Sequence, residues 1–194
     1  MSSDAGRYPS VIAFFDDAYR RYERYWWQRE TRYSTDPADH AQSLITSHLL
    51  EALKHRKPGK ALDVGAGEGT DAIRLAKLGY EVDAVEGSSV GAAKTEQFAR
   101  DEGVRLNIIN IDVNAFVSSE GYDVIVCNGL LHYIEDQARL VQRLQDVTAP
   151  DGLNAVSLWS GRTPVPECHR VVESYVDTSS EVADDWTGGV RSPV

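Results

Sequence analysis

Aromatic side chains recur at helical spacing near the start of the chain. They stand at positions i, i+4, i+7 and i+11: Phe15, Tyr19, Tyr22 and Trp26. This spacing predicts a helix over residues 10–32. A second helix is predicted over residues 38–56, where apolar positions keep the same period and a Lys-Pro-Gly-Lys run follows. We therefore expect residues 1–57 to form a helical cap.

From residue 58 onward, short apolar runs alternate with helical patterns. The apolar runs predict strands over residues 61–64, 81–86, 104–111, 122–128 and 153–159, and the segments between them predict helices over residues 70–78, 88–102 and 135–147. Strands that alternate with helices of this length build a mostly parallel sheet covered on both faces. The pattern thus predicts a doubly wound, Rossmann-like α/β core over residues 58–160 and a C-terminal tail over residues 161–194.

Length and composition fit this picture and narrow the class of protein. A chain of 194 residues suits one α/β domain. Its longest apolar run, Val11–Phe15, is far shorter than the roughly 20 residues of a membrane span, and residues 1–30 contain no apolar signal-peptide core. Cys127 and Cys168 are too few for a disulfide framework or a zinc site. We expect a soluble, cytoplasmic protein with no metal and no membrane partner.

The charge of the chain argues against a nucleic-acid partner. The formal net charge is −10, and most of the acidic excess lies after residue 60. Nucleic-acid binding needs clustered positive charge that neutralises phosphates. The Arg-rich stretch from Arg20 to Arg32 is interrupted by carboxylates, so a solvated helix face is favoured over a surface for an acidic partner.

A run of glycines lies between the first predicted strand and the next helix. Residues 63–70 read Asp-Val-Gly-Ala-Gly-Glu-Gly-Thr. A dinucleotide-binding turn, G-x-G-x-x-G, is the competing interpretation, but here the third glycine comes one residue early. Three carboxylates surround the loop: Asp63, Glu68 and Asp71. Each would disfavour a pyrophosphate at ~4 Å by about 4 kcal/mol, and a helix N-terminus recovers only about 0.3–2 kcal/mol. The loop therefore favours a ligand with positive charge over a nicotinamide dinucleotide.

The motif D-x-G-x-G-x-G after a first strand resembles class I S-adenosylmethionine-dependent methyltransferases, and residues 63–69 match it at every fixed position. The resemblance covers about residues 25–160. Residues 25–27, 61–88 and 181–186 look most similar to the short TehB-like (tellurite-resistance type) branch. The resemblance implies S-adenosyl-L-methionine as cofactor, a sheet ordered 3-2-1-4-5 and methyl transfer to a small molecule. An S-adenosylmethionine-binding protein without transferase activity is the alternative.

The resemblance also implies a set of cofactor-binding residues. Glu86 ends the second predicted strand, where an acidic side chain can accept the ribose hydroxyls, and Asp112 follows the third, near the adenine in this family. Either could be an ordinary exposed carboxylate. The full set is Asp63, Gly65, Ala66, Gly67, Glu86, Gly87, Asp112, Val113 and Asn128.

Catalytic and substrate-facing residues are less constrained by the sequence. His132, four residues after Asn128, is the candidate general base, with a histidine that packs beside the cofactor as the alternative. Aromatic residues of the cap could wall an apolar acceptor or could simply dock the helix on the sheet. The candidates for facing the substrate are Tyr22, Tyr25, Trp26, Tyr33 and His40.

The end of the chain leaves little sequence for further strands. The sequence predicts a proline-broken loop over residues 161–166 and a short acidic helix over residues 179–186, so too few residues follow for a hairpin of ordinary length. We expect the closing hairpin of the family to be missing and the fifth strand to lie at an open edge. Residues 168–176 or a second subunit, in a homodimer, would cover that edge.

Overall fold

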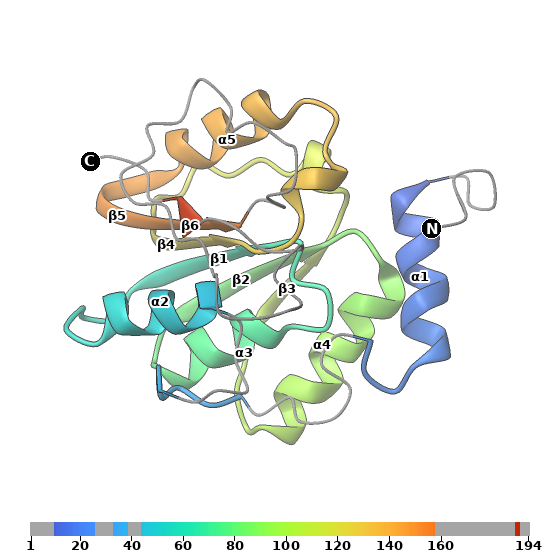
Figure 1. The fold of residues 1–194 in the computed structure, drawn as a ribbon, viewed down its shortest axis with the longest axis horizontal. Coiled ribbons are helices and arrows are strands. Elements are labelled where there is room, and N and C mark those ends of the chain that lie inside the picture. The colour runs from blue at the N-terminus through green and yellow to red at the C-terminus, as the bar shows by residue number, and fades with distance from the viewer. Residues whose placement is uncertain (1–9, 26–32, 39–43, 158–188, 191–194) are drawn as a thin grey trace, which may run out of the picture.

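The computed structural model describes residues 10–25, 33–38, 44–157 and 189–190. These residues form a six-stranded sheet in the order β3-β2-β1-β4-β5-β6 with helices on both faces (Figure 1). The strands are β1 Lys60–Val64, β2 Glu81–Glu86, β3 Asn107–Asn110, β4 Tyr122–Cys127, β5 Thr148–Ser157 and β6 Gly189–Val190. The first five pair in parallel in the predicted order 3-2-1-4-5, which confirms the doubly wound α/β fold.

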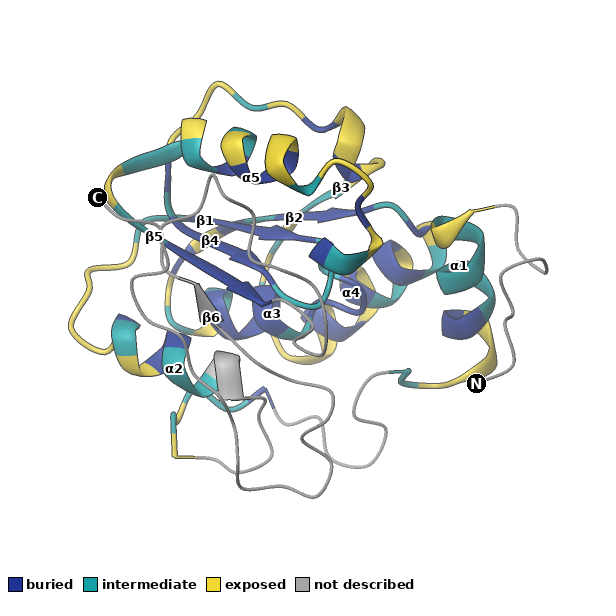
Figure 2. Ribbon diagram, turned by 45° about the horizontal axis from the view of Figure 1, so that its top comes forward, coloured by how far each residue is buried: buried dark blue, intermediate teal, exposed yellow. Residues whose placement is uncertain are grey.

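Alternate residues of each strand face opposite layers of helices. One face packs against α2 Leu44–Leu53, α3 Thr70–Lys77 and α4 Ser89–Asp101, and the other packs against α5 Gln137–Asp146 (Figures 1 and 2). Ala61 and Val124 belong to the first core, whereas their neighbours Leu62 and Ile125 belong to the second. Because both faces are covered, the central strands are apolar on both sides and almost completely buried (Figure 2).

The first helix is shorter than its aromatic period predicts. Helix α1 spans Val11–Arg21 and ends at Tyr22, which adopts an extended conformation. The prediction of a helix over residues 10–32 is therefore wrong for residues 22–25, and residues 26–32 lie outside the described part of the chain. In Figure 1, α1 stands beside α4 at the edge of the molecule. Beyond α1, the Tyr25 backbone N–H donates to the Glu68 carboxylate instead of to a helix carbonyl.

Other element boundaries shift by a few residues. The second helix is described over Leu44–Leu53 and ends three residues before the predicted residue 56, while residues 39–43 lie outside the described part. The third strand begins at Asn107 instead of residue 104. The fifth strand is longer than predicted because it starts at Thr148 and includes Pro150-Asp151-Gly152. Its register against β4 shifts between Tyr122 and Val124, which absorbs the extra residues as an irregularity of the ladder.

The edge at β5 is a correction to the sequence interpretation. Strand β6 pairs antiparallel with the last two residues of β5, Val156 and Ser157, so β5 does not end as an open edge there. Residues 158–188, with the segment expected to cover this edge and the acidic helix, lie outside the described part. The domain boundaries at residues 57 and 160 and the homodimer stay predictions. None of the described helices is long and apolar enough to cross a membrane.

Candidate active site

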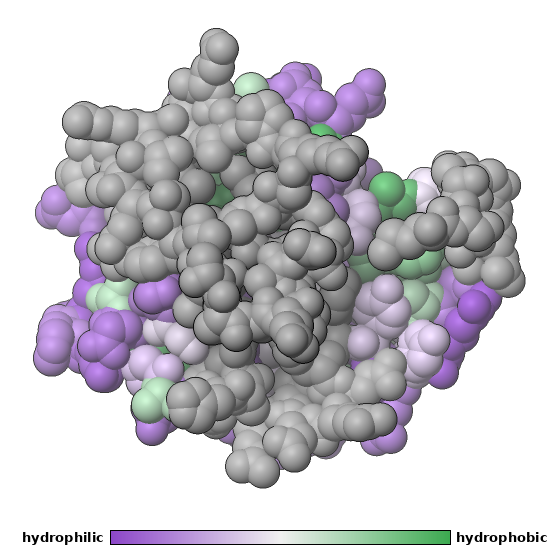
Figure 3. Space-filling model, in the orientation of Figure 1, coloured by the Kyte–Doolittle hydropathy of each residue, from purple (hydrophilic) through white to green (hydrophobic). Residues whose placement is uncertain are grey.

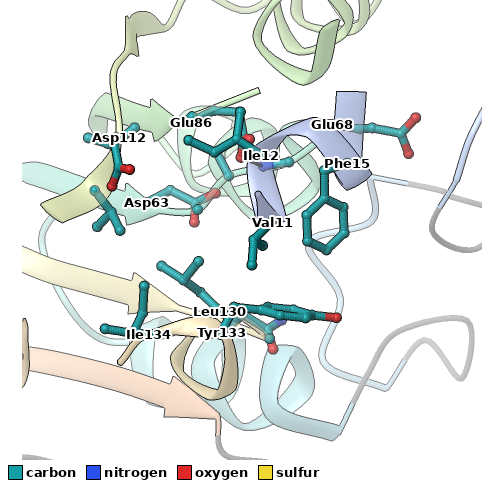
Figure 4. Close-up of a pocket in the computed structure, with 18 of the residues that line it drawn as sticks. Val11, Ile12, Phe15, Asp63, Glu68, Glu86, Asp112, Leu130, Tyr133 and Ile134 are labelled. Atoms are coloured by element: carbon teal, nitrogen blue, oxygen red, sulfur yellow. Dashed lines mark hydrogen bonds between the residues drawn. The ribbon is translucent and has the colours of Figure 1, made fainter. Parts of the chain in front are cut away.

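A cavity of about 560 Å³ opens at the carboxyl ends of β1, β2 and β4. Strand order reverses between β1 and β4, and ligands of doubly wound sheets bind at such a reversal. Figure 4 shows Asp63 and Glu86 on one side of the cavity, Leu130, Tyr133 and Ile134 on the opposite side, and α1 closing the end between them. All nine residues that the sequence nominates for cofactor binding line this cavity: Asp63, Gly65, Ala66, Gly67, Glu86, Gly87, Asp112, Val113 and Asn128.

The glycine loop needs glycine for two separate reasons. Gly65, Gly67 and Gly69 have φ angles of 75°, 60° and 78°, in the left-handed region that residues with a Cβ rarely adopt. A Cβ on Gly67 would also lie 2.8 Å from the Tyr19 hydroxyl oxygen of α1. The loop therefore turns from β1 into α3 while leaving room for a helix that crosses it.

Asp63 is buried at the end of β1 beneath this loop. It is 3% exposed, and its Oδ2 accepts a hydrogen bond from the Ala72 backbone N–H at 2.9 Å. Burial, together with the neighbouring carboxylates of Asp71 and Glu86, raises the pKa of Asp63 well above its ordinary value. Asp63 thus supports the first turn of α3 and places at the cavity a carboxyl group whose ionised form is disfavoured without a cationic partner.

Glu86 ends β2 and joins two parts of the site. Its Oε2 accepts the Gly67 backbone N–H and its Oε1 accepts the Ser88 backbone N–H, both at 2.7 Å. The side chain is 8% exposed, and burial raises its pKa despite these two bonds. Each carboxylate oxygen keeps a second lone pair that can face a ligand. Glu86 is therefore held in place by backbone groups and remains able to accept hydroxyl donors.

The two other polar candidates are placed differently. Asp112 is exposed and caps a short 3₁₀ turn by accepting the Asn114 backbone N–H at 2.8 Å. Asn128 is engaged through both ends of its amide, because it donates to Asp71 Oδ2 at 2.8 Å and accepts the Ser157 hydroxyl at 2.8 Å. Its side chain therefore ties the start of α3 to the ends of β4 and β5.

The sequence interpretation missed the residues with which α1 lines the cavity. They are Val11, Ile12, Phe15 and Tyr19, and the rings of Phe15 and Tyr133 meet edge to face with centroids 5.2 Å apart. Figure 3 shows apolar surface beside α1 bordered by hydrophilic surface. The i, i+4 spacing of Val11, Phe15 and Tyr19 is the signal that could have found this wall. The wall itself depends on α1 crossing the glycine loop, which spacing does not reveal.

The candidate base, His132, lies next to residues that line the cavity. Among the described residues that line it are Leu130, Tyr133 and Ile134, but not His132, whose ring packs on Tyr133 with centroids 4.0 Å apart. Burial lowers the pKa of His132, so the neutral imidazole is favoured near neutral pH. The role of His132 as a base stays a prediction.

The aromatic candidates of the cap are also away from the cavity where they are described. Tyr22 is 44% exposed, and Tyr33 is buried against Ile73 and Phe98 instead. Tyr25 is likewise absent from the described residues that line the cavity. The two remaining candidates, Trp26 and His40, lie outside the described residues. Their substrate-facing roles stay predictions.

Comparison with curated proteins gives distant relatives of the same kind. The chain is 27% identical over 113 residues to the ubiquinone biosynthesis O-methyltransferase of Rickettsia canadensis (strain McKiel), covering 58% of this chain and 46% of that protein. It is 26% identical over 124 residues to the probable S-adenosyl-L-methionine-dependent methyltransferase TehB of Haemophilus influenzae (strain 10810), covering 63% and 43%. The chain spans about half the length of the curated relatives it matches.

Solved structures share the fold at low sequence identity. TehB from Haemophilus influenzae superposes with a TM-score of 0.59 at 18% identity, covering 78% of this chain and 61% of that one. An S-adenosylmethionine-dependent methyltransferase from Thiobacillus denitrificans superposes with a TM-score of 0.53 at 20% identity, covering 68% and 53%. The sequence model of the family described as "Methyltransferase domain" matches residues 38–187. Because this match extends over most of the residues, the chain belongs to the methyltransferase domain family.

Proposed function

We propose that this protein transfers a methyl group from S-adenosyl-L-methionine to a small-molecule acceptor. The observation that carries the proposal is a glycine loop flanked by two buried carboxylates, Asp63 and Glu86, on one wall of the cavity. Membership of the methyltransferase domain family supports it. The names of the curated relatives, ubiquinone biosynthesis O-methyltransferases among them, support a small organic acceptor.

The charges of the cavity fit a cofactor that bears a sulfonium and an ammonium group. Asp63, Asp71 and Glu86 are each less than one tenth exposed, and the buried cation beside them, Arg74, is paired with Asp71 at 3.1 Å. Negative charge therefore exceeds positive charge among these buried groups, and burial raises the pKa of both Asp63 and Glu86. A cationic ligand offsets this charge, whereas a pyrophosphate would add to it.

Each acidic position has a proposed partner on the cofactor. Glu86 would accept the ribose hydroxyls with the lone pairs that Gly67 and Ser88 leave free. Asp63 would support the ammonium group through its charge and through the loop backbone. Asp112, with the buried Val113 beside it, would face the adenine at the end of the cavity.

When bound, S-adenosyl-L-methionine supplies a methyl group that is already activated by its sulfonium leaving group. The task of the protein is therefore to hold an acceptor in line with the methyl carbon and to exclude water. The apolar wall of Val11, Phe15 and Leu130 provides such a dry surface. A hydroxyl acceptor would need a base, for which His132 is the candidate and which contributes about 10²–10⁴-fold. Thiols, amines and soft anions need less help.

Two measurements test the proposal. Calorimetric titration should detect binding of S-adenosyl-L-methionine and S-adenosyl-L-homocysteine, with NAD(H) as the negative control. A screen for S-adenosyl-L-homocysteine release against phenols, thiols, other metabolites and selenium or tellurium oxyanions should then identify the acceptor class. Binding without release from any acceptor would favour the non-catalytic alternative. Binding of NAD(H) in place of both cofactor forms would overturn the proposal.

A further inference from the structure

Residues 10–25, here called the N-terminal strap, lie across the glycine loop and the start of α4. Tyr19 of α1 is 3% exposed and rests where two glycines leave space. A Cβ on Gly91 would come within 2.9 Å of the Tyr19 ring, and one on Gly67 within 2.8 Å of its hydroxyl oxygen. A Cβ on Gly87 would likewise come within 3.0 Å of Ile12. The strap thus packs against a surface on which glycines at positions 67, 87 and 91 leave room for its side chains.

Beyond the end of α1, a buried ion pair holds the backbone of the strap. Glu68 Oε2 accepts the Tyr25 backbone N–H at 2.8 Å, and Glu68 Oε1 accepts a proton of the Lys94 ammonium at 2.8 Å. The same ammonium donates to the carbonyl oxygens of Tyr22 and Glu23. Three backbone groups of the strap, in Tyr22, Glu23 and Tyr25, are therefore bound by one carboxylate and one ammonium.

The ion pair is more than a surface contact. The Glu68 side chain is 4% exposed and the Lys94 side chain 16% exposed, so solvent screens the pair far less than an exposed one. Glu68 is the residue between Gly67 and Gly69, and Figure 4 shows its carboxylate turned away from Asp63 and Glu86. The glycine loop therefore borders the cavity on one face, and the Glu68 carboxylate binds the backbone of the strap on the other.

A second polar contact holds the middle of the strap, at Asp16 within α1. The Ser88 hydroxyl, which caps α4, donates to Asp16 Oδ1 at 2.5 Å, and the Val90 backbone N–H donates to the same oxygen at 3.3 Å. Ser88 also donates its backbone N–H to Glu86. The strap is thereby connected, at Asp16 and at residues 22–25, to residues that shape the proposed cofactor site.

We propose that Glu68 and Lys94 are positioning residues that hold the N-terminal strap closed over the cavity and thereby set how long the nucleoside ligand is retained. The proposal rests on the proposed function for the identity of that ligand, S-adenosyl-L-methionine or its product. Phe15 and Tyr19 of the strap form part of the cavity wall, so opening of the strap would uncover one side of a bound ligand. Breaking the ion pair frees the backbone of residues 22–25 and lowers the barrier to release.

The test compares Glu68→Gln and Lys94→Met with Arg100→Met, which removes another cation of α4 whose exposed partner is Glu96. Dissociation of S-adenosyl-L-homocysteine from the full chain is followed by stopped-flow displacement. We expect Glu68→Gln and Lys94→Met to release it about tenfold to a hundredfold faster, the range for a charge-assisted hydrogen bond. Arg100→Met should match the wild type, and Lys94→Arg should release the ligand more slowly than Lys94→Met because it keeps the positive charge, although not the geometry of the ammonium.

A ligand-free measurement separates this proposal from the proposed function. Trypsin cleavage after Arg20 and Arg21 reports opening of the strap without any cofactor. We expect Glu68→Gln and Lys94→Met to be cleaved at least several-fold faster than the wild type at a temperature well below the melting temperature of every variant, since loss of one partner of a buried pair also lowers stability. Failure of the wild type to bind S-adenosyl-L-homocysteine would contradict the proposed function alone. The positioning role of Glu68 and Lys94 would be refuted if both variants were cleaved at the wild-type rate and, where the ligand binds, released it at the wild-type rate.

Discussion

Replacing Glu86 with Gln should weaken both the fold and the cofactor site, by amounts that can be separated. The two carboxylate oxygens accept backbone N–H groups of Gly67 and Ser88 at 2.7 Å. A glutamine side chain has one oxygen, so its NH₂ group must face one of these donors. The variant loses one hydrogen bond to a charged group, worth about 1.5–3 kcal/mol, and leaves a buried N–H without its acceptor.

One effect opposes this loss. Burial raises the pKa of Glu86, which means that the ionised side chain is disfavoured in the folded, ligand-free protein, and a neutral amide removes that cost. We therefore expect a net decrease in the free energy of unfolding of about 1–3 kcal/mol near neutral pH. This is a sizeable share of the roughly 5–15 kcal/mol that stabilises a typical domain. Urea denaturation of the ligand-free protein measures it.

Cofactor affinity should fall separately from stability. If the remaining lone pairs of Glu86 accept the ribose hydroxyls, Glu86→Gln weakens S-adenosyl-L-homocysteine binding by about tenfold to a hundredfold. Glu81→Gln, at the exposed start of the same strand, is the matched control and should change neither quantity. A stability equal to that of Glu81→Gln would refute the bridging role of Glu86. An unchanged dissociation constant would refute the ribose assignment.

Two further predictions address Asp63 and His132. Because the pKa of Asp63 is raised in the folded state, its stabilising contribution is present below its ordinary pKa and is lost as the pH rises through the raised value. Asp63→Asn should therefore be stabilised relative to the wild type at neutral pH in thermal melts, yet bind S-adenosyl-L-methionine more weakly and with less pH dependence; a destabilised variant would contradict this. His132→Gln should lower turnover by about tenfold or less, because His132 packs on Tyr133 instead of lining the cavity. A loss of about 10²–10⁴-fold with a changed pH–rate profile would instead identify His132 as the base.

The sheet and the glycine loop were predictable because their signals are local. Apolar runs of strand length alternate with helical patterns, and the right-handed connection rule then leaves few arrangements of the strands. The tight turn from Asp63 to Gly69 can be recognised in the sequence because backbone with positive φ angles favours glycine. Glu86 and Asp112 were nominated because the family resemblance assigns roles to acidic residues at these strand ends. All nine nominated residues line one cavity for the same reason: in a parallel sheet these ends meet at one edge.

The position of the N-terminal strap beside the cavity depends on contacts between segments that are distant in the sequence. Helix α1 ends at Arg21 although its aromatic period continues to Trp26, and the backbone beyond it is bound by Glu68 and Lys94. A local sequence pattern cannot predict a hydrogen bond between residues 43 positions apart, such as the one that Tyr25 donates to Glu68. Such a contact exists only once the sheet has set the distance between the strap and the loop.

The outcome for His132 and for β5 has the same origin. His132 lies four residues after Asn128, which predicts a place near the cavity. In the 3₁₀ turn at Leu131–Tyr133, however, Tyr133 lines the cavity and the His132 imidazole packs on the Tyr133 ring. Strand β6 meets β5 by pairing residues more than thirty positions apart, for which a two-residue run gives no periodic signal. Periodicity and turn chemistry fix elements and their order, whereas side-chain direction and edge pairing depend on packing that only the assembled fold provides.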